Sequence, residues 1–489
     1  MIDALLTPRK LSSTMSSLFT ILIVLNCIIL CNSTLTEDHK VIIAHRGASA
    51  YAPEHSLVAY TLAMELQSHY IEPDLLLTKD NHFIAMHDLI IDNVTNIIDH
   101  PEFFNRYTTK KVPNKRGVLE DVAGYFVDDF TLNEIKSLRL RQRGRWKERH
   151  HNLDDIFTVP TLNEIAQLVK SKHEQQKLLQ ELQLKQNNQK QQYSTNNNNN
   201  HNNDDSSHIN YRDKNSNNHA HNKTETQFGM YIELKHPDYY AMKGIQVGQM
   251  LLNELKNLGF QTRYNDTTGH YSIRTSSVND ISDDSGIIPS PIVIQTFDPS
   301  TLEHLSQESD IPLVQLIEPH DEGADLSILQ WSELKNRYNS KLSGVGIDKN
   351  SLTALSLKSA QSHIAAIHEA GMVVHSYTSR ADHYDGIAKH FNHSFYAETM
   401  YLFCCLNVDG IFIEQPDIGR EYSSTLRAQT QEQGHDSDDE FSKRNLNGCP
   451  ITCEDFQPDT NTVSSPNPNP RSGSTVSVMI DINRDLSDL

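Results

Sequence analysis

Basic residues are in short supply in this chain of 489 residues, which carries 43 lysines and arginines against 63 aspartates and glutamates, a formal net charge of −20. A protein that binds nucleic acid needs a concentrated basic surface to neutralise phosphates. We therefore expect no nucleic-acid partner. A small anionic substrate is still compatible with this balance, because a cation and a few basic side chains gathered in a pocket can attract one.

Long apolar runs are also scarce. The one candidate lies near the N-terminus, where Arg9 and Lys10 precede the apolar residues 18–31. A positive flank before an apolar core too short for a comfortable membrane span is typical of a secretory signal peptide. We place this peptide at residues 1–33, with an uncleaved signal anchor as the alternative. No other stretch is long enough to span a bilayer, and the polar C-terminus excludes a lipid-anchor tail.

Cysteine is sparse, with six residues in the chain, two of which lie in the predicted signal peptide. The four that remain are Cys404, Cys405, Cys449 and Cys453. In a secreted chain they permit disulfides whose connectivity the spacing does not give, although the last two could close a small loop. We expect no cysteine-based metal site, because no histidine accompanies the pair in the tail and only two cysteines lie there. Secretion is supported by Asn-x-Ser/Thr sequons at Asn93, Asn222, Asn265 and Asn392.

Two segments lack the composition of a folded domain. Residues 178–226 consist mostly of Gln, Asn, His, Asp and Ser, and residues 423–489 are similarly polar. Such segments cannot bury enough apolar surface to fold. We predict a disordered insert in the first case and a disordered tail in the second. The remainder, residues 38–422, is long enough for one barrel-sized domain.

Residues 41–88 hold an unusual concentration of polar side chains at the ends of apolar runs. Three such runs end in His45-Arg46-Gly47, Glu72-Pro73-Asp74 and His87-Asp88. Positions i and i+2 of a strand point to the same face, so Glu72 and Asp74 can grip one cation together. The ends of buried strands are where α/β folds expose their ligands. The stretch therefore predicts a site for metal-assisted chemistry on an anion.

This stretch resembles the glycerophosphodiester phosphodiesterase family, in its bacterial periplasmic branch more than in its short cytosolic one. The matching pieces are His45-Arg46-Gly47, Pro53-Glu54-His55, the Glu72/Asp74 pair with Leu75 and Thr78-Lys79-Asp80, and His87-Asp88. The resemblance covers residues 41 to 420, roughly, with one large interruption.

Further matches follow downstream. Glu233 and Lys235 share one face of an apolar strand, and this strand resembles the one that supplies the family's third metal carboxylate and a phosphate-binding lysine. Gln295 ends the next predicted strand. Glu414 and Gln415 stand where the family more often has an aspartate and an aromatic residue, so their role is left open. His375, Tyr377 and Arg380 resemble a strand end that lines the pocket, with packing as the alternative.

Apolar runs alternate with helical patterns along the chain. Runs that begin near 41, 71, 83, 230, 291, 312, 342, 372 and 408 give eight core strands, with one marginal. This alternation implies a parallel sheet buried on both faces. Eight such strands predict a (β/α)8 TIM barrel with its functional residues at the C-terminal rim.

The predicted site residues fit phosphodiester hydrolysis. Three carboxylates, Glu72, Asp74 and Glu233, suit a hard divalent cation; we favour Ca²⁺ for its extracellular abundance and the resemblance, with Mg²⁺ as the alternative. Arg46, Lys235 and Gln295 would bind the substrate, the first two through its phosphate oxygens. His45 and His87 would act as general acid and base. The resemblance implies that a glycerol hydroxyl attacks phosphorus, and that water then opens a cyclic phosphate.

The expected activity is that of a secreted, metal-dependent enzyme that hydrolyses small glycerophosphodiesters, such as glycerophosphocholine, to sn-glycerol 3-phosphate and an alcohol. One alternative keeps the site but acts on lysophospholipids, as in related barrel phospholipases D. Another is a non-catalytic secreted binding protein on the same barrel. Retention of both histidines and all three carboxylates weighs against the latter.

Overall fold

The computed structural model describes residues 40–114, 117–144, 149–199, 228–260, 292–317, 328–382, 387, 391–432 and 451–456. The predicted signal peptide, residues 200–226 of the predicted insert and most of the predicted tail lie outside these ranges. Within them, no helix is both long enough and apolar enough to cross a bilayer.

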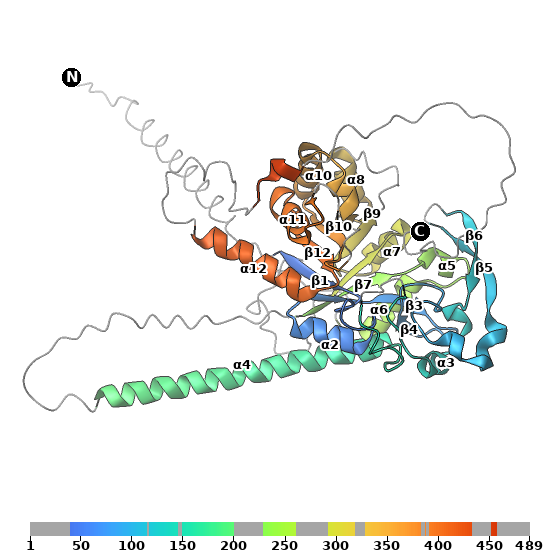
Figure 1. The fold of residues 1–489 in the computed structure, drawn as a ribbon, viewed down its shortest axis with the longest axis horizontal. Helices are drawn as coiled ribbons and strands as arrows, with labels where there is room; N and C mark the ends of the chain where they lie inside the picture. The colour runs from blue at the N-terminus through green and yellow to red at the C-terminus, as the bar shows by residue number, and fades with distance from the viewer. Residues whose placement is uncertain are drawn as a thin grey trace, which may run out of the picture.

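Eight parallel strand positions close into a barrel (Figure 1). In order they are β1 (Val41–His45), β2 (Tyr70–Glu72) with its continuation β3 (Asp74–Leu77), β7 (Gly229–Leu234), β8 (Ile292–Thr296), β9 (Leu313–Ile317), β10 (Leu342–Asp348), β11 (Val373–Ser379) and β12 (Gly410–Ile413). Each pairs with the next, and β12 pairs with β1, which closes the ring. The predicted (β/α)8 barrel is confirmed.

Alternating side chains along the strands divide the apolar core in two, as expected for a barrel whose interior is packed. One set fills the interior and includes Val41, Ile43, Tyr231 and Phe412. The other, which includes Ile42 and Ala44, packs outward. The helices that cover this outer face are α2 (Leu57–Glu65), α4 (Leu162–Asn199), α5 (Pro237–Ala241), α6 (Val247–Asn257), α7 (Pro299–Glu308), α8 (Ile328–Arg337), α9 (Lys349–Thr353), α10 (Leu357–Glu369), α11 (Phe395–Met400) and α12 (Pro416–Glu432).

Pro73 divides the second strand position into β2 and β3, because proline has no N–H to donate to the ladder. The register against β7 continues across the break: Ile71 pairs with Met230, and three residues later Asp74 pairs with Glu233. The carbonyl of Pro73 still accepts the Glu233 N–H at 2.9 Å. The proline therefore interrupts hydrogen bonding without moving the two carboxylates off their shared face.

The marginal ninth run is β4 (Phe83–Ala85), which pairs antiparallel with β3 outside the closed ring. A separate hairpin follows it, formed by β5 (Thr108–Pro113) and β6 (Leu119–Gly124). The sequence pattern does not predict this hairpin. The short helical elements of this region are η1 (Ile97–Asp99), η2 (Pro101–Arg106), η3 (Val127–Asp129) and α3 (Leu132–Ser137).

Helix α4 runs further than the sequence predicted. It begins after Thr161, whose hydroxyl accepts the Glu164 N–H in a capping box. It continues to Asn199 and projects away from the barrel (Figure 1), so residues 178–199 are helical and not disordered. The reason is local: this part contains no Gly or Pro, and residues 178–192 hold six Gln, four Leu and two Lys, which favour helix by intrinsic propensity.

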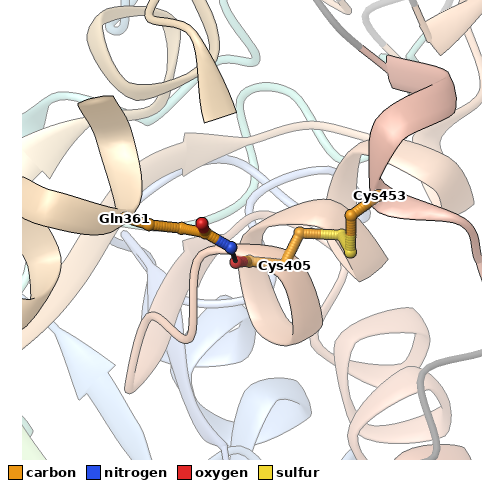
Figure 2. Close-up of a disulfide and its surroundings, with 3 residues drawn as sticks. All are labelled: Gln361, Cys405 and Cys453. Carbon is orange, nitrogen blue, oxygen red and sulfur yellow. Dashed lines mark hydrogen bonds between the residues drawn. A yellow bond between two sulfur atoms is a disulfide. The ribbon is translucent and has the colours of Figure 1, made fainter. Parts of the chain in front are cut away.

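A disulfide joins the described C-terminal residues to the barrel (Figure 2). Cys405, the last residue of η8 (Tyr401–Cys405), is bonded to Cys453, the first residue of η9 (Cys453–Phe456). The side chain of Gln361 on α10 donates to the Cys405 carbonyl at 2.9 Å. The small loop between Cys449 and Cys453 considered from the sequence is therefore not formed.

Helix α12 (Pro416–Glu432) extends ten residues past the predicted end of the domain at 422.

His375 lies in the barrel interior and has a packing role. It is fully buried on β11, and its Nδ1 lies 2.8 Å from the hydroxyl of Tyr231. Of the two roles left open by the sequence, pocket or packing, the structure supports packing. Arg380, two residues after Thr378, instead reaches the rim and contacts Glu414.

We expect His375 to make the protein sensitive to mild acid. Burial lowers the pKa of His375 to about 4 from an ordinary value of 6.5, so the folded state resists protonation that the unfolded chain accepts. Stability is thus intact above pH 6.5 and falls by about 3 kcal/mol as the pH drops towards 4, at 1.36 kcal/mol per pH unit. In urea denaturation across this range, His375→Gln should lose less stability than the wild type. Equal slopes for this variant, the wild type and the exposed control His82→Gln would contradict the prediction.

Candidate active site

Three carboxylates meet at the C-terminal rim of the barrel. Glu72 ends β2, Asp74 begins β3 and Glu233 is the penultimate residue of β7. One oxygen of each lies within 4.8 Å of the others, and all three side chains are buried. The structure therefore brings together the three residues predicted as metal ligands.

The neighbours of these carboxylates fix their orientation. Glu72 accepts the backbone N–H of Arg46 at 2.8 Å and the side-chain amide of Gln295 at 3.2 Å. Asp74 Oδ2 lies 2.9 Å from Nε2 of His55, and Glu233 accepts from Lys235 at 2.8 Å. Asp74 Oδ1 is buried with no hydrogen-bond partner among the described residues. A buried carboxylate oxygen of this kind fits a cation ligand.

The electrostatics of the cluster also fit a cation. Burial, together with the charges of Asp74 and Glu233, raises the pKa of Glu72 well above its ordinary value. Burial raises the pKa of Glu233 to about 7, with Lys235 opposing and Asp74 reinforcing the shift. The pKa of Asp74 is lowered, because Lys235 and His55 outweigh its burial. Crowded, oxygen-only donors are the set that a hard divalent cation prefers.

His87 follows β4 and lies beside this cluster. Its Nδ1 is 2.5 Å from Oδ1 of Asp88, and its Nε2 is 3.0 Å from Nζ of Lys235. Burial and the nearby cations Arg46 and Lys235 lower the pKa of His87 well below its ordinary value. The ring is therefore neutral at physiological pH, with Nδ1–H donated to Asp88 and the lone pair of Nε2 turned towards Lys235. A neutral Nε2 of this kind can accept a proton.

His45 ends β1 and is paired in register with Glu72. Its Nδ1 lies 3.0 Å from Oε1 of Glu414, and burial, followed by the charge of Arg46, lowers the pKa of His45 to about 4. This ring is also neutral and presents Nε2 on its opposite edge.

The turn that follows His45 requires a glycine. A Cβ on Gly47, at φ +83°, would lie 2.7 Å from the carbonyl carbon of Ala59.

The predicted substrate-binding residues lie around the same cluster. Nζ of Lys235 reaches both Glu233 and His87, and Gln295 borders Glu72. Arg46 is present too, but its guanidinium lies between Glu54, at 3.2 Å, and Asp74, at 3.3 Å. Its predicted contact with a phosphate stays a prediction.

Comparison with known proteins identifies the family. Residues 45–224 and 205–418 match the glycerophosphoryl diester phosphodiesterase family, and together these ranges span most of the chain. The chain belongs to this family. As a glycerophosphoryl diester phosphodiesterase family protein it is a phosphoric diester hydrolase by class.

Relatives of the family occur in plants and bacteria. The chain is 24% identical over 393 residues to glycerophosphodiester phosphodiesterase GDPD6 of Arabidopsis thaliana, which covers 76% of this chain and 82% of that protein. It is 37% identical over 116 residues to a glycerophosphodiester phosphodiesterase of Haemophilus influenzae, across 24% of this chain and 28% of that protein. A solved glycerophosphodiester phosphodiesterase of Agrobacterium tumefaciens aligns with a TM-score of 0.39 at 16% identity, over 78% of this chain and 99% of that one.

Several residues that support the site of this glycerophosphoryl diester phosphodiesterase family member were not predicted from the sequence. Glu414, whose role was left open, is the partner of His45. Asp88 holds His87, and Glu54 lies between Arg46 and Arg143. One local pattern in the sequence points to the arginines that hold these carboxylates: residues 139–149 carry a basic side chain at every second position, within an acidic chain.

Proposed function

We propose that the chain is a secreted, divalent-cation-dependent glycerophosphodiester phosphodiesterase that hydrolyses substrates such as glycerophosphocholine to sn-glycerol 3-phosphate and an alcohol. One observation carries this proposal. The buried carboxylates Glu72, Asp74 and Glu233 converge within 4.8 Å at the rim that also holds His45 and His87. Family membership supplies the class of reaction, and this cluster supplies the means to perform it.

Each protein group has a distinct task in the proposed reaction. A bound cation would withdraw charge from a phosphoryl oxygen. Lys235 and Arg46 would hold the remaining phosphoryl oxygens. One neutral histidine takes the proton of the glycerol hydroxyl on Nε2 as its oxygen bonds to phosphorus. The other histidine, in the imidazolium form that the bound phosphate anion favours, delivers its Nε2 proton to the alcohol oxygen as the bond from that oxygen to phosphorus breaks. Water then opens the cyclic phosphate with the proton transfers reversed, and the intramolecular first step gains from proximity.

The finer features of the proposal concern the ion, the compartment and the branch of the family. Ca²⁺ is favoured over Mg²⁺ because the three carboxylates offer oxygen donors alone and the extracellular setting is rich in calcium. Secretion is supported by the Cys405–Cys453 disulfide, since such bonds persist in oxidising compartments. Glycosylation is supported by the exposure of two sequon asparagines, Asn93 and Asn392. The motifs of residues 45–88 support the bacterial periplasmic branch.

The function is tested by measuring glycerol 3-phosphate release from glycerophosphocholine. Release should require a divalent cation, fall to background with a chelator and return when Ca²⁺ is added back, because the carboxylate cluster then regains its ligand. Lysophosphatidylcholine, tested in parallel, should be cleaved far more slowly than glycerophosphocholine, with choline release as the common measure. Chelator-insensitive release would contradict metal dependence, and preferential turnover of lysophosphatidylcholine would replace the proposed substrate class with lysophospholipids.

A further inference from the structure

The two histidines are supported in the same way. Each ring directs Nδ1 to a buried or nearly buried carboxylate, Asp88 for His87 and Glu414 for His45. The two carboxylates come from opposite ends of the barrel sequence, after β4 and after β12. Such a partner fixes both the ring orientation and the tautomer of a histidine that exchanges protons through Nε2.

Both carboxylates are in turn held by arginines of one short segment. Nη1 of Arg143 lies 2.8 Å from Oδ2 of Asp88. Arg149, six residues later, donates through Nη2 to Oε2 of Glu414. For both carboxyl groups the favourable charges outweigh burial, so that the pKa of Asp88 and that of Glu414 lie well below their ordinary values. We refer to Arg143 and Arg149 as the arginine pair.

The arginine pair is committed to protein groups and does not face the substrate. Arg143 uses Nε and Nη2 on the two oxygens of Glu54, at 2.7 and 2.8 Å, and Nη1 on Asp88. Arg149 uses Nε on Asp382 at 2.6 Å, Nη1 on the carbonyl of Ser49 at 3.2 Å and Nη2 on Glu414. Both side chains are only 3% exposed. With every guanidinium nitrogen engaged and buried, neither residue is placed to bind a phosphate.

Side chains of this segment also contact the loop that follows His45. The side chain of Gln142, next to Arg143, donates to the Ser49 carbonyl at 3.0 Å, the same carbonyl that Arg149 contacts. The Ser49 hydroxyl donates back to the carbonyl of His45 at 2.8 Å. Three residues of one segment, Gln142, Arg143 and Arg149, therefore contact the groups that support both histidines.

We propose that the arginine pair positions the two catalytic histidines, Arg143 through Asp88 for His87 and Arg149 through Glu414 for His45, so that each ring keeps its proton on Nδ1 and presents Nε2 to the reaction. This inference rests on the proposed function for the roles of the histidines. It assigns the pair to the chemical step and not to substrate binding. It also predicts that each arginine affects catalysis through one histidine and independently of the other arginine.

The experiment is a set of double-mutant cycles on glycerol 3-phosphate release. Arg149→Gln and Arg143→Gln should each lower kcat by about tenfold or more with KM nearly unchanged, because the interaction lost acts only in the chemical step. Arg149→Lys should recover part of the loss, since a lysine keeps the charge but cannot span Glu414, Asp382 and Ser49 together. The matched control is Arg141→Gln on the same segment, whose partners are the exposed Asp99 and Asp155; it should stay near the wild-type rate.

The cycles separate positioning from a general structural effect. In a His45→Gln background, Arg149→Gln should lower kcat little further, whereas in a His87→Gln background it should lower kcat by its full factor. Arg143→Gln should show the reverse. An equal loss in every background would overturn the proposal. So would a loss confined to KM, or a wild-type kcat in both single variants.

A spectroscopic measurement keeps the inference separable from the proposed function. With ¹⁵N-labelled histidine, the ring nitrogens of His45 are identified by their loss in His45→Gln and should report a protonated Nδ1 in the wild type. Arg149→Gln should shift this ring towards a mixture of tautomers, and Arg141→Gln should not. If the wild type releases no glycerol 3-phosphate, the proposed function fails and this spectrum alone decides; an unchanged His45 tautomer in Arg149→Gln would overturn the inference.

Discussion

His45→Gln should abolish most turnover while leaving the barrel folded. The amide can still hydrogen-bond Glu414, at the position where Nδ1 of His45 lies 3.0 Å from that carboxylate, but it cannot exchange a proton with the substrate. A general acid–base group contributes about 10²–10⁴-fold, and we expect a loss of kcat in that range. His87→Gln should show a loss of similar size, because its ring is also held by a carboxylate at Nδ1 and has the second proton-transfer role. Initial rates of glycerol 3-phosphate release, with circular dichroism to check folding, provide the measurement.

The control for this prediction is His82→Gln. His82 lies between β3 and β4, close in sequence to His87, but its side chain is 54% exposed and its nearest charged partner, Asp80, is 3.9 Å away. This variant should retain wild-type rates. A His45→Gln protein with normal activity would refute the assignment of His45 as a catalytic residue.

Glu233→Gln should weaken the binding of the divalent cation. The cation loses one of three carboxylate ligands while the shape of the side chain is preserved, so the affinity for Ca²⁺ should fall by about 10²-fold and activity should fall with it. Isothermal titration with Ca²⁺ and thermal unfolding at increasing Ca²⁺ concentrations measure this directly. Binding that stabilises the folded state raises the melting temperature of the wild type, and this rise should disappear in the variant.

Without added cation the same substitution should stabilise the protein at alkaline pH. The pKa of Glu233 is raised to about 7 from an ordinary 4.5 by burial and the charge of Asp74, so stability present below pH 4.5 is lost as the pH rises through 7. The amide removes this loss. The matched control is Glu303→Gln, at an exposed position on α7. It should change neither the affinity for Ca²⁺ nor the stability at alkaline pH. A wild-type response to Ca²⁺ in Glu233→Gln would rule out Glu233 as a ligand.

The barrel and the acidic cluster were predictable because their signals are local in sequence. Apolar runs mark the strands, and each site residue lies at or just past the end of one, as with His45 after Val41–Ala44. In a closed parallel barrel all such ends meet on one rim, so convergence of Glu72 and Glu233 followed from topology once eight strands were counted. Even Pro73 did not disturb this, since the register with β7 continues across it.

The supporting residues could not be predicted, because their partners are distant in sequence and their contacts depend on irregular backbone. Glu414 lies 369 residues from His45, and Arg143 lies 89 residues from Glu54. Neither pairing follows from periodicity. The length of α4 has a different reason: a polar composition that cannot form a core predicts disorder, whereas helix propensity alone extends this helix past Leu178.

The Cys405–Cys453 bond has a practical corollary for limited proteolysis. A cut anywhere between α12 and Cys453 would leave the distal fragment attached, because the bond bridges 48 residues of sequence. Such a nicked molecule would run as one species in non-reducing gel electrophoresis and separate into two bands only after a thiol is added. Apparent integrity in the absence of reductant is therefore no guide to whether the polypeptide is continuous.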